Sequence, residues 1–310
     1  MKFLPFEKEL EKIYLAMQRN PGDEKLKRMF DEKLKEIYTN LQPYEVVEIA
    51  RHPERPHTED YISNIITDFV ELHGDRYFGD DPAMITGIGR LNETVVGVIG
   101  HRKGKNLKEQ LEAHFGMANP EGYRKALRVV RLASEKFNAP IISFLDTPGA
   151  NPTEEAEERG VAHAIATNLM EFFNIPTPIV VVVIGEGGSG GALGIGVGDR
   201  ILMLKYAIYS VISPEGCASI LFGNASKAKE AATSLKLTSE ELLKLKVIDK
   251  IIEEPIGGAH RFKEITMRNV KEAISNTLEE LTKIKREDLL KMRKEKFLKM
   301  GVYDEKQKYQ

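Results

Sequence analysis

The stretch Pro178-Ile-Val-Val-Val-Val-Ile184, followed by Gly185-Glu-Gly-Gly-Ser-Gly-Gly-Ala-Leu-Gly-Ile-Gly-Val-Gly198, decides the fold of this chain. The β-branched run predicts a buried strand over residues 179–184, and the residues behind it predict a short apolar helix. Eight of the 25 glycines lie in residues 185–198, although glycine weakens both helices and strands. Such a run suits a backbone whose N–H groups approach a ligand at a helix N-terminus. We therefore expect an anionic group, or one that becomes anionic, at this loop.

A second strand, predicted over residues 141–145, ends in a similar turn, Asp146-Thr-Pro-Gly-Ala150. Proline favours the turn, and Gly149 can take a positive φ there. Two neighbouring backbone turns can aim their N–H groups at one point, which is how an oxyanion hole is built. The candidate donors are Gly149 and Ala150 in this turn and Gly190 and Gly191 in the glycine run.

Around these two strands, apolar strands alternate with helical segments, which predicts an α/β fold with largely buried strands. The other predicted strands cover residues 84–91, 94–101, 201–204 and 208–212, the first two as a hairpin. The predicted helices cover residues 58–72 and 155–173, and two more begin at Pro120 and Pro214.

The two ends of the chain have a more uniform helical pattern. Apolar residues recur at helical spacing in two stretches before residue 42, and Asn20-Pro-Gly-Asp23 separates them. We predict a helical hairpin in residues 1–57 that needs a surface to pack on, closed by a proline-containing linker at 51–57. Residues 58–260 are the mixed domain, and residues 261–310 are predicted to form a charged helical tail.

The composition is that of a soluble globular protein, with 42% apolar and 30% charged residues. The 45 basic and 47 acidic residues give a net charge of −2, which excludes a global attraction to nucleic acid or anionic membranes. The single cysteine, Cys217, excludes an internal disulfide framework and a cysteine-rich zinc site, and the histidines lack metal-ligand spacing, so we expect no metal. No segment reads as a secretory signal or a membrane span, and we expect a cytoplasmic protein.

The glycine run also fits other patterns. Gly185-x-Gly187-x-x-Gly190 matches the dinucleotide fingerprint, but no acidic residue stands about 20 positions later, as that site requires. A P-loop is excluded by Ala192 at the lysine position. Ser189 lies in a nucleophile-elbow pattern, and Asp249 and His260 follow it in the order found in α/β-hydrolases. A purely structural interpretation, in which the glycines only permit close packing of helix and strand, also stays open.

Further candidates concern a cofactor. Arg124 and Lys125 lie in the first turn of a predicted helix, and they suit a phosphate or cofactor contact about as well as a solvated helix face. Gly187 and Gly188 are candidates for cofactor contacts within the glycine run. The basic segment 101–105 reads instead as solvated surface in a mobile loop.

Eight motifs, in one consistent order between residues 45 and 262, closely resemble the α subunit of bacterial acetyl-CoA carboxylase carboxyltransferase. They are Arg51-His-Pro-Glu-Arg-Pro, His73-Gly-Asp-Arg, Phe115-Gly-Met, Pro120-Glu-Gly-Tyr-Arg-Lys-Ala-Leu-Arg128, Asp146-Thr-Pro-Gly-Ala, Gly185-Glu-Gly-Gly-Ser-Gly-Gly-Ala, Tyr209-Ser-Val-Ile-Ser-Pro-Glu-Gly-Cys-Ala-Ser219 and Glu254-Pro-Ile-Gly-Gly-Ala-His-Arg261. Motifs of this number, length and order are highly specific.

The resemblance implies a crotonase-like superhelix of ββα units. It also implies transfer of a carboxyl group from carboxybiotin to acetyl-CoA, which gives malonyl-CoA for fatty acid biosynthesis. In that family a separate biotin carboxyl carrier protein bears the carboxybiotin, and biotin carboxylase is a further partner. The α subunit joins a second α subunit and two β subunits in an α₂β₂ assembly, where the β subunit mainly binds CoA and carries a four-cysteine zinc finger.

By the same resemblance, Gly190 and Gly191 are donors to the ureido oxygen of biotin, and the Gly149–Ala150 turn completes the hole. The freed biotin nitrogen can take the proton from acetyl-CoA, which agrees with the lack of an evident side-chain base. The segment Asn151-Pro-Thr-Glu-Glu155 departs from the family, which has tyrosine and a glycine-bearing turn there. A related biotin-dependent acyl-CoA carboxylase or decarboxylase is the alternative, since it shares the pair of glycine turns.

Overall fold

The fold is built on one mixed sheet. A computed structural model describes residues 2–300, so residues 301–310 of the predicted tail lie outside the described residues. The strands are β1 (Thr67–Glu71), β2 (Met84–Leu91), β3 (Thr94–His101), β4 (Ile141–Thr147), β5 (Ile179–Gly188), β6 (Arg200–Leu204), β7 (Ile208–Ser210) and β8 (Lys250–Ile252). Their order across the sheet is β1-β2-β3-β4-β5-β6-β8, and β7 pairs with the end of β5.

The centre of the sheet is parallel and buried. β1, β2 and β3 pair antiparallel, whereas β3 to β6 and β8 run parallel. β4 is buried along its whole length and β5 along all but its last residue, which explains why their sequences are nearly continuous apolar runs. The register aligns Thr147 with Gly187, so both strands end at the same edge of the sheet. This shared edge brings the two predicted turns together.

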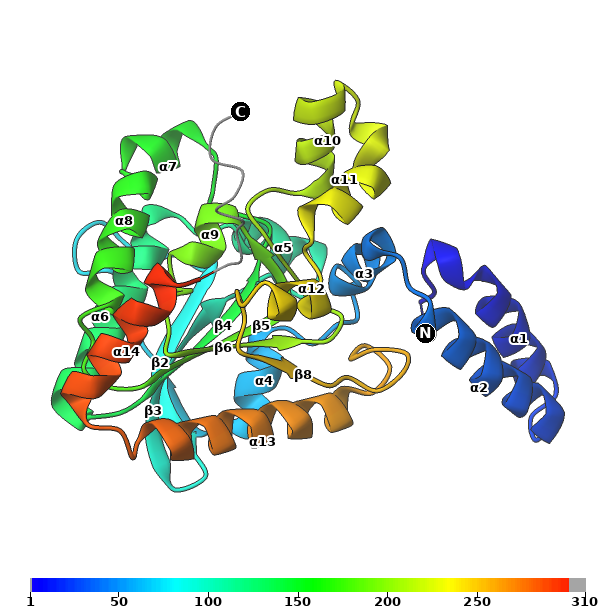
Figure 1. Cartoon of the computed structure of the whole chain (residues 1–310), viewed down its shortest axis with the longest axis horizontal. Coiled ribbons are helices and arrows are strands. Elements are labelled where there is room, and N and C mark those ends of the chain that lie inside the picture. The colour runs from blue at the N-terminus through cyan, green and yellow to red at the C-terminus, as the bar shows by residue number, and fades with distance from the viewer. Residues whose placement is uncertain (1, 301–310) are drawn as a thin grey trace.

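Helices surround the sheet (Figure 1). Their bounds are α1 (Lys8–Arg19), α2 (Glu24–Thr39), α3 (Pro43–Ala50), α4 (Thr58–Ile65), α5 (Leu107–Glu112), α6 (Pro120–Phe137), α7 (Glu154–Glu158), α8 (Val161–Phe172), α9 (Ser189–Leu193), α10 (Pro214–Phe222), α11 (Ala228–Leu235), α12 (Ser239–Lys244), α13 (Lys263–Leu281) and α14 (Arg286–Leu298). α6 packs on β2 and β3, while α13 packs on α4, β5 and β8. The main apolar core lies between these helices and the strands.

Two predicted helices and one strand differ in the structure. The predicted helix over residues 58–72 ends at Ile65, because residues Thr67–Glu71 pair with β2 as an edge strand. This pairing is a tertiary interaction that the local pattern does not contain. The predicted helix over 155–173 is divided into α7 and α8 at Gly160, which has a φ of +81°. The strand predicted over 208–212 ends at Ser210.

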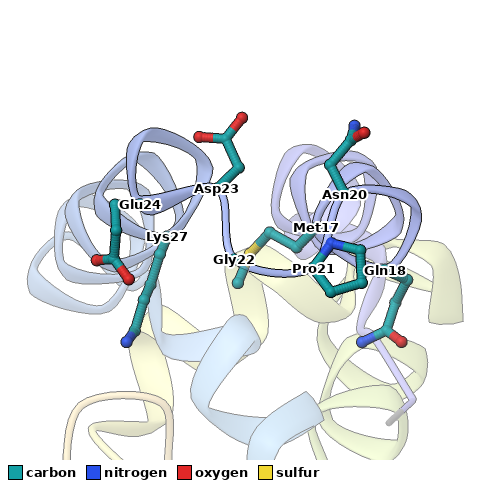
Figure 2. A pocket seen from close by; sticks show the side chains of 8 residues that line it. All are labelled: Met17, Gln18, Asn20, Pro21, Gly22, Asp23, Glu24 and Lys27. Atoms are coloured by element: carbon teal, nitrogen blue, oxygen red, sulfur yellow. The ribbon is translucent and has the colours of Figure 1, made fainter.

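The predicted N-terminal hairpin is confirmed. α1 and α2 pack together, and Figure 2 shows Pro21 and Gly22 in the turn that joins them. Asp23 caps α2 by accepting hydrogen bonds from the N–H groups of Lys25 and Leu26. The hollow at this turn, about 280 Å³, is lined only by the turn and the two helix ends. The hairpin packs through a second apolar cluster on α3, a helix that the sequence pattern did not predict.

The C-terminal helices are attached to the sheet through a buried arginine. Arg293 of α14 is 1% exposed, and its guanidinium donates to both carboxylate oxygens of Asp199, at 2.7 and 2.9 Å. The remaining N–H groups donate to the carbonyl oxygens of Phe172, Ile175 and Thr177. Because a buried charge is tolerated only when it is paired and hydrogen-bonded, this set of contacts determines where α14 can pack.

Candidate active site

The turn at residues 147–150 and the glycine run meet backbone to backbone at the edge where β4 and β5 end. A Cβ added to Gly191 would lie 2.3 Å from the carbonyl carbon of Gly149 and 2.6 Å from the nitrogen of Ala150. A Cβ added to Gly188 would lie 2.1 Å from the carbonyl oxygen of Pro148. No side chain fits at such distances, so this contact requires glycine at both positions. The structure thus brings the two predicted turns into contact.

Several N–H groups at this contact are left without an acceptor. Gly190 and Gly191 lie in the first turn of α9, where N–H groups have no intrahelical acceptor, and no side chain caps this helix. The N–H of Ala150 makes no hydrogen bond within residues 2–300. The N–H of Gly149, in contrast, donates to Thr147 Oγ1 at 3.1 Å. Gly190, Gly191 and Ala150 are therefore the predicted donors that remain available to a ligand oxygen.

A buried histidine connects the two turns. His101, at the end of β3, is fully buried, and its Nδ1 accepts a hydrogen bond from the N–H of Asp146 at 3.4 Å. Its Nε2 lies 3.2 Å from the carbonyl oxygen of Gly191, so Nε2 carries the proton and donates to that oxygen. Burial lowers the pKa of His101 to about 4, which keeps the ring neutral at physiological pH. The ring therefore holds the peptide of Gly191 against the end of β4.

Four charged side chains and one histidine form a largely buried network beneath the turns. The ammonium group of Lys103 lies 3.0 Å from Asp146 Oδ1 and 2.8 Å from Glu186 Oε2. Arg51 donates to the other oxygen of Glu186 at 2.6 Å, and His57 Nδ1 lies 3.0 Å from Asp146 Oδ2. Glu186 lies within the glycine run itself, and its N–H donates to Asp146 at 3.1 Å. These contacts hold the ends of β4 and β5 together.

The electrostatics of this network keep all four groups charged. Burial by itself would lower the pKa of Lys103, but the carboxylates of Asp146 and Glu186 outweigh it and raise this pKa to about 12. Burial would likewise raise the pKa of each carboxyl group, yet Lys103 holds both pKa values below their usual range, together with the hydrogen bond from His57 at Asp146 and the charge of Arg51 at Glu186. A lysine with a raised pKa and carboxylates with lowered ones are poor proton carriers near pH 7. The network therefore supports the turns rather than moving protons.

The prediction of a solvated, mobile surface at residues 101–105 is wrong for its inner residues. His101 is fully buried, and the side chain of Lys103 is only 16% exposed. The sequence did contain a signal for this arrangement. Asp146 and Glu186 follow two buried strands, and carboxylates at such positions need a cation close by. The sequence did not show which lysine or arginine would supply it.

The four residues predicted to bind a cofactor have other contacts. Arg124 Nε lies 2.8 Å from Asp75, and the buried Lys125 Nζ lies 2.6 Å from Asp80, both in the loop before β2. Gly187 and Gly188 pair with neighbouring strands, and a Cβ on Gly187 would lie 2.6 Å from the ring of Tyr209. Cofactor binding by these four residues stays a prediction.

The serine-hydrolase interpretation is supported by the backbone at Ser189 but not by the histidine that would act as the base. Ser189 has a φ of +48° between β5 and α9, as a nucleophile elbow requires. His260 stacks on His52, with ring centroids 4.0 Å apart, and its Nε2 lies 2.7 Å from Arg261. Burial lowers the pKa of His260 to about 2, so its ring is a very weak base. The carboxylate of Asp249 is bound by the backbone N–H of Ile201 and by Lys296, and no triad forms among residues 2–300.

Between residues 2 and 300, no three His, Cys, Asp or Glu side chains are grouped so that they could hold a metal ion. Over the same residues, no helix has both the length and the apolar character that crossing a membrane would require. Cys217 is buried.

Comparison with known protein families gives a match over nearly the whole chain. Residues 6–301 match the family described as acetyl co-enzyme A carboxylase carboxyltransferase-like. The acetyl-coenzyme A carboxylase carboxyl transferase subunit alpha of Methylococcus capsulatus is 50% identical over 98% of this chain and 98% of its own length. The subunit of the same name from Fusobacterium nucleatum is 51% identical over 96% of this chain and 95% of its own length. The subunit of the same name from Treponema denticola is 58% identical over 81% of this chain and 82% of its own length.

Solved structures confirm the predicted fold class. Transcarboxylase 12S aligns with a TM-score of 0.61 at 18% identity, over 77% of this chain and 44% of that chain. A chain of a Pseudomonas malonate decarboxylase hetero-tetramer aligns with a TM-score of 0.57 at 14% identity, over 70% of this chain and 86% of that chain. At such identities the likeness concerns the fold alone. The chain therefore has the α/β crotonase-like fold that the resemblance implied.

Proposed function

The chain belongs to the family of acetyl-coenzyme A carboxylase carboxyl transferase alpha subunits, and on that premise we propose that its two turns form the biotin half of the active site. In this proposal the subunit takes part in moving a carboxyl group from carboxybiotin, borne by a separate carrier protein, to acetyl-CoA. The product is malonyl-CoA, the precursor for fatty acid biosynthesis. The observation that carries the proposal is the set of unused N–H groups where the two turns touch.

The donors suit a ureido oxygen better than a permanent anion. Gly190, Gly191 and Ala150 offer neutral N–H groups, and the charges beneath them are already paired within the protein. Preorganised neutral donors stabilise an oxygen chiefly while it gains charge, so they favour the reaction over tight binding of the resting ligand. When bound, carboxybiotin supplies the carboxyl group that is transferred. The chain itself supplies the donors and a rigid backbone to hold them.

The buried side chains position these donors. His101 fixes the carbonyl of Gly191, and Lys103 joins the carboxylates at the ends of β4 and β5. An oxyanion hole is effective only if its donors keep their direction while charge develops. We therefore assign His101 and Lys103 as positioning residues, and no side chain of this chain is proposed as the general base.

The remaining components belong to partners. Membership of an alpha-subunit family implies a multisubunit enzyme. We propose that the partners are a zinc-finger-bearing β subunit that binds most of the CoA, a second copy of this chain, the biotin carboxyl carrier protein and biotin carboxylase. We also propose that the complex works in the cytoplasm, where acetyl-CoA is available to it.

The substitution Gly191→Val tests this proposal in the assembled complex. Its side chain would have to displace the Gly149–Ala150 peptide, because a Cβ there already lies within 2.6 Å of three atoms of that peptide. Loss of one oxyanion donor typically costs about 2.7–4 kcal/mol of transition-state stabilisation. We expect malonyl-CoA formation to fall by at least about a hundredfold while assembly with the β subunit persists, as measured by steady-state turnover and size-exclusion chromatography.

Two substitutions in the same loop serve as controls. Gly190→Ala keeps its N–H, and its Cβ would lie 3.6 Å from Ile165, an ordinary packing distance, so turnover should stay within a few-fold of the parent. Ser189→Gly removes the hydroxymethyl side chain from a residue with positive φ, a conformation that glycine adopts freely, and it should leave turnover unchanged. Near-normal turnover in Gly191→Val would contradict the oxyanion assignment. Loss of activity in Ser189→Gly would instead support a nucleophilic serine.

A further inference from the structure

An arginine-rich groove runs along the outer face of α6, beside the loop at residues 73–81. It has a volume of about 540 Å³, which is within the range of small-molecule sites. Its lining includes five cations against two carboxylates, and therefore carries a net charge of about +3. The charged lining residues are Asp75, Arg76, Arg124, Arg128, Arg131, Glu135 and Lys136.

Three of the cations at or next to this groove are paired with carboxylates. Arg124 is paired with Asp75, Lys125 with Asp80 and Arg131 with Glu171, at 2.6–2.8 Å. Arg76 and Arg128 form no ion pair within residues 2–300. The two nearest carboxylates are already satisfied, since Asp75 also accepts three backbone N–H groups and Asp80 accepts that of Gly74. Of the lining cations, Arg76, Arg128 and Lys136 are therefore unpaired within residues 2–300, and two of them, Arg76 and Arg128, lie on one backbone carbonyl.

These two guanidinium groups are held side by side by the backbone. Arg76 Nη1 donates to the carbonyl oxygen of His73 at 2.9 Å, and Arg128 Nη2 donates to the same oxygen at 3.1 Å. Arg128 Nε also donates to the carbonyl of Gly74 at 3.0 Å. Burial and the charge of Arg76 lower the pKa of Arg128. Two like charges fixed on one acceptor repel each other, so this pair is unfavourable unless an anion joins it.

The backbone at Arg76 is also unfavourable for an arginine. Its φ is +63°, in the left-handed region where residues other than glycine are strained. Glycine would occupy this position without strain, so the side chain itself needs an explanation. Next to it, the ring of Tyr77 is 86% exposed and lies 5.3 Å from the guanidinium of Arg124. An exposed aromatic ring that contacts an arginine of a cationic groove is a surface on which a nucleic base can stack.

We propose that this groove binds a phosphorylated nucleotide, with its phosphate groups on Arg76 and Arg128 and its base on Tyr77. Arginine presents several N–H donors in a planar fork that matches phosphate oxygens, and each guanidinium here is already oriented by the backbone. The ligand is either a free nucleotide or the nucleotide portion of coenzyme A, which share this chemistry. The proposal is independent of the oxyanion hole, because none of its residues belongs to the two turns.

Isothermal titration calorimetry on the full-length chain tests the site, with ATP, coenzyme A and inorganic phosphate as separate probes. We expect ATP or coenzyme A to bind more tightly than phosphate, and binding to weaken as salt is raised. Arg76→Gly and Arg128→Gln should each reduce the affinity for the tighter nucleotide by about tenfold or more, the effect of losing one hydrogen bond to a charged group. Tyr77→Ala should weaken nucleotide binding but leave phosphate binding unchanged.

The control is Arg90→Gln, which removes one exposed arginine outside the groove and should change none of these affinities. Arg76→Gly removes the strain at the same time as the charge, so loss of binding in that variant is not a sign of misfolding. Tighter binding of coenzyme A than of ATP assigns the groove to the acyl carrier, and the reverse order assigns it to a free nucleotide.

Three results would overturn the proposal. The first is no detectable binding of either nucleotide at up to about 5 mM, or binding that both arginine variants retain. The second is equal affinity for phosphate and nucleotide, which would leave no role for the base. The third is tighter binding of a single-stranded oligonucleotide that the same variants abolish, since the groove would then contact nucleic acid.

Discussion

Beneath the two turns, Lys103 lies between two carboxylates, whereas on the outer face of α6 Arg76 and Arg128 share one carbonyl oxygen and no carboxylate. The first group of charges is buried and balanced. The second is partly exposed and carries an excess of positive charge. Each group lies beside a site for which we propose a ligand. In these proposals the buried group only holds the backbone in place, whereas the surface group contacts its ligand directly.

The difference agrees with the ligands that we propose for the two sites. A buried ion pair cannot offer its charge to a ligand without leaving the partner unpaired, so it serves to hold the backbone in place. An unpaired surface cation loses little by staying in water and can exchange that water for an anion. Neutral backbone donors over a balanced network therefore suit an oxygen whose charge is transient, and unpaired arginines suit a ligand with permanent charge.

Among the substitutions that test this comparison, Lys103→Met should change stability and activity the most. The substitution leaves the carboxylates of Asp146 and Glu186 facing each other without their shared cation. Breaking a buried pair in this way costs about 3–5 kcal/mol. We expect the free energy of unfolding, measured by urea titration, to fall by that amount and malonyl-CoA formation to be lost with it.

The matched control is Lys105→Met, two residues later in the same loop. The Lys105 side chain is 53% exposed and pairs with Asp60, and exposed pairs contribute only about 0–1 kcal/mol. If both lysine variants lost the same stability, the distinction between the buried network and the surface would not hold.

A smaller effect is expected from His101→Gln, and it should be seen in how the free energy of unfolding depends on pH. Burial lowers the pKa of folded His101 to about 4, whereas the unfolded value is about 6.5. Between these values the unfolded state binds the proton and the folded state does not, so stability falls as the pH is lowered. From pH 7.5 to 5 this amounts to about 2 kcal/mol for this one group. The glutamine variant should lack that part of the acid sensitivity in urea titrations at pH 7.5 and 5.

His163→Gln is the comparison for this experiment, because His163 is exposed on α8, away from the buried network. Its acid sensitivity should match that of the parent chain. A His101→Gln variant that loses stability on acidification as steeply as the parent would show that the ring is not held neutral.

The smallest effect is expected from Arg76→Gly on stability. The variant loses one exposed hydrogen bond, but it also loses a left-handed φ and a like-charge contact. We expect the free energy of unfolding to stay the same or to rise by up to about 1 kcal/mol. A loss of several kcal/mol would mean that Arg76 is a structural residue, and it would remove the contrast with Lys103.

Sequence pattern predicted the parts of this molecule that depend on local repetition. The β-branched runs before Asp146 and Gly185 gave two buried strands, and the Asn20–Asp23 turn gave the N-terminal hairpin. It did not predict β1, because residues Thr67–Glu71 become a strand only by pairing with β2. Arg124 and Lys125 show the same limit. Their spacing suggested a cationic face, but the loop at residues 73–81 neutralises both and leaves Arg128, one turn further along, unpaired.

The sequence by itself determined that glycine turns follow two central strands, and it led to the prediction that the backbone rather than side chains would meet the ligand. This is so because strand propensity and glycine content are local properties of the chain. Only the tertiary structure decided that His101 accepts the N–H of Asp146 and donates to the carbonyl of Gly191, and that Lys103 is the cation beneath both turns. Those assignments depend on which groups the fold brings within hydrogen-bonding distance across 40 or more residues of chain, and no local pattern records that distance.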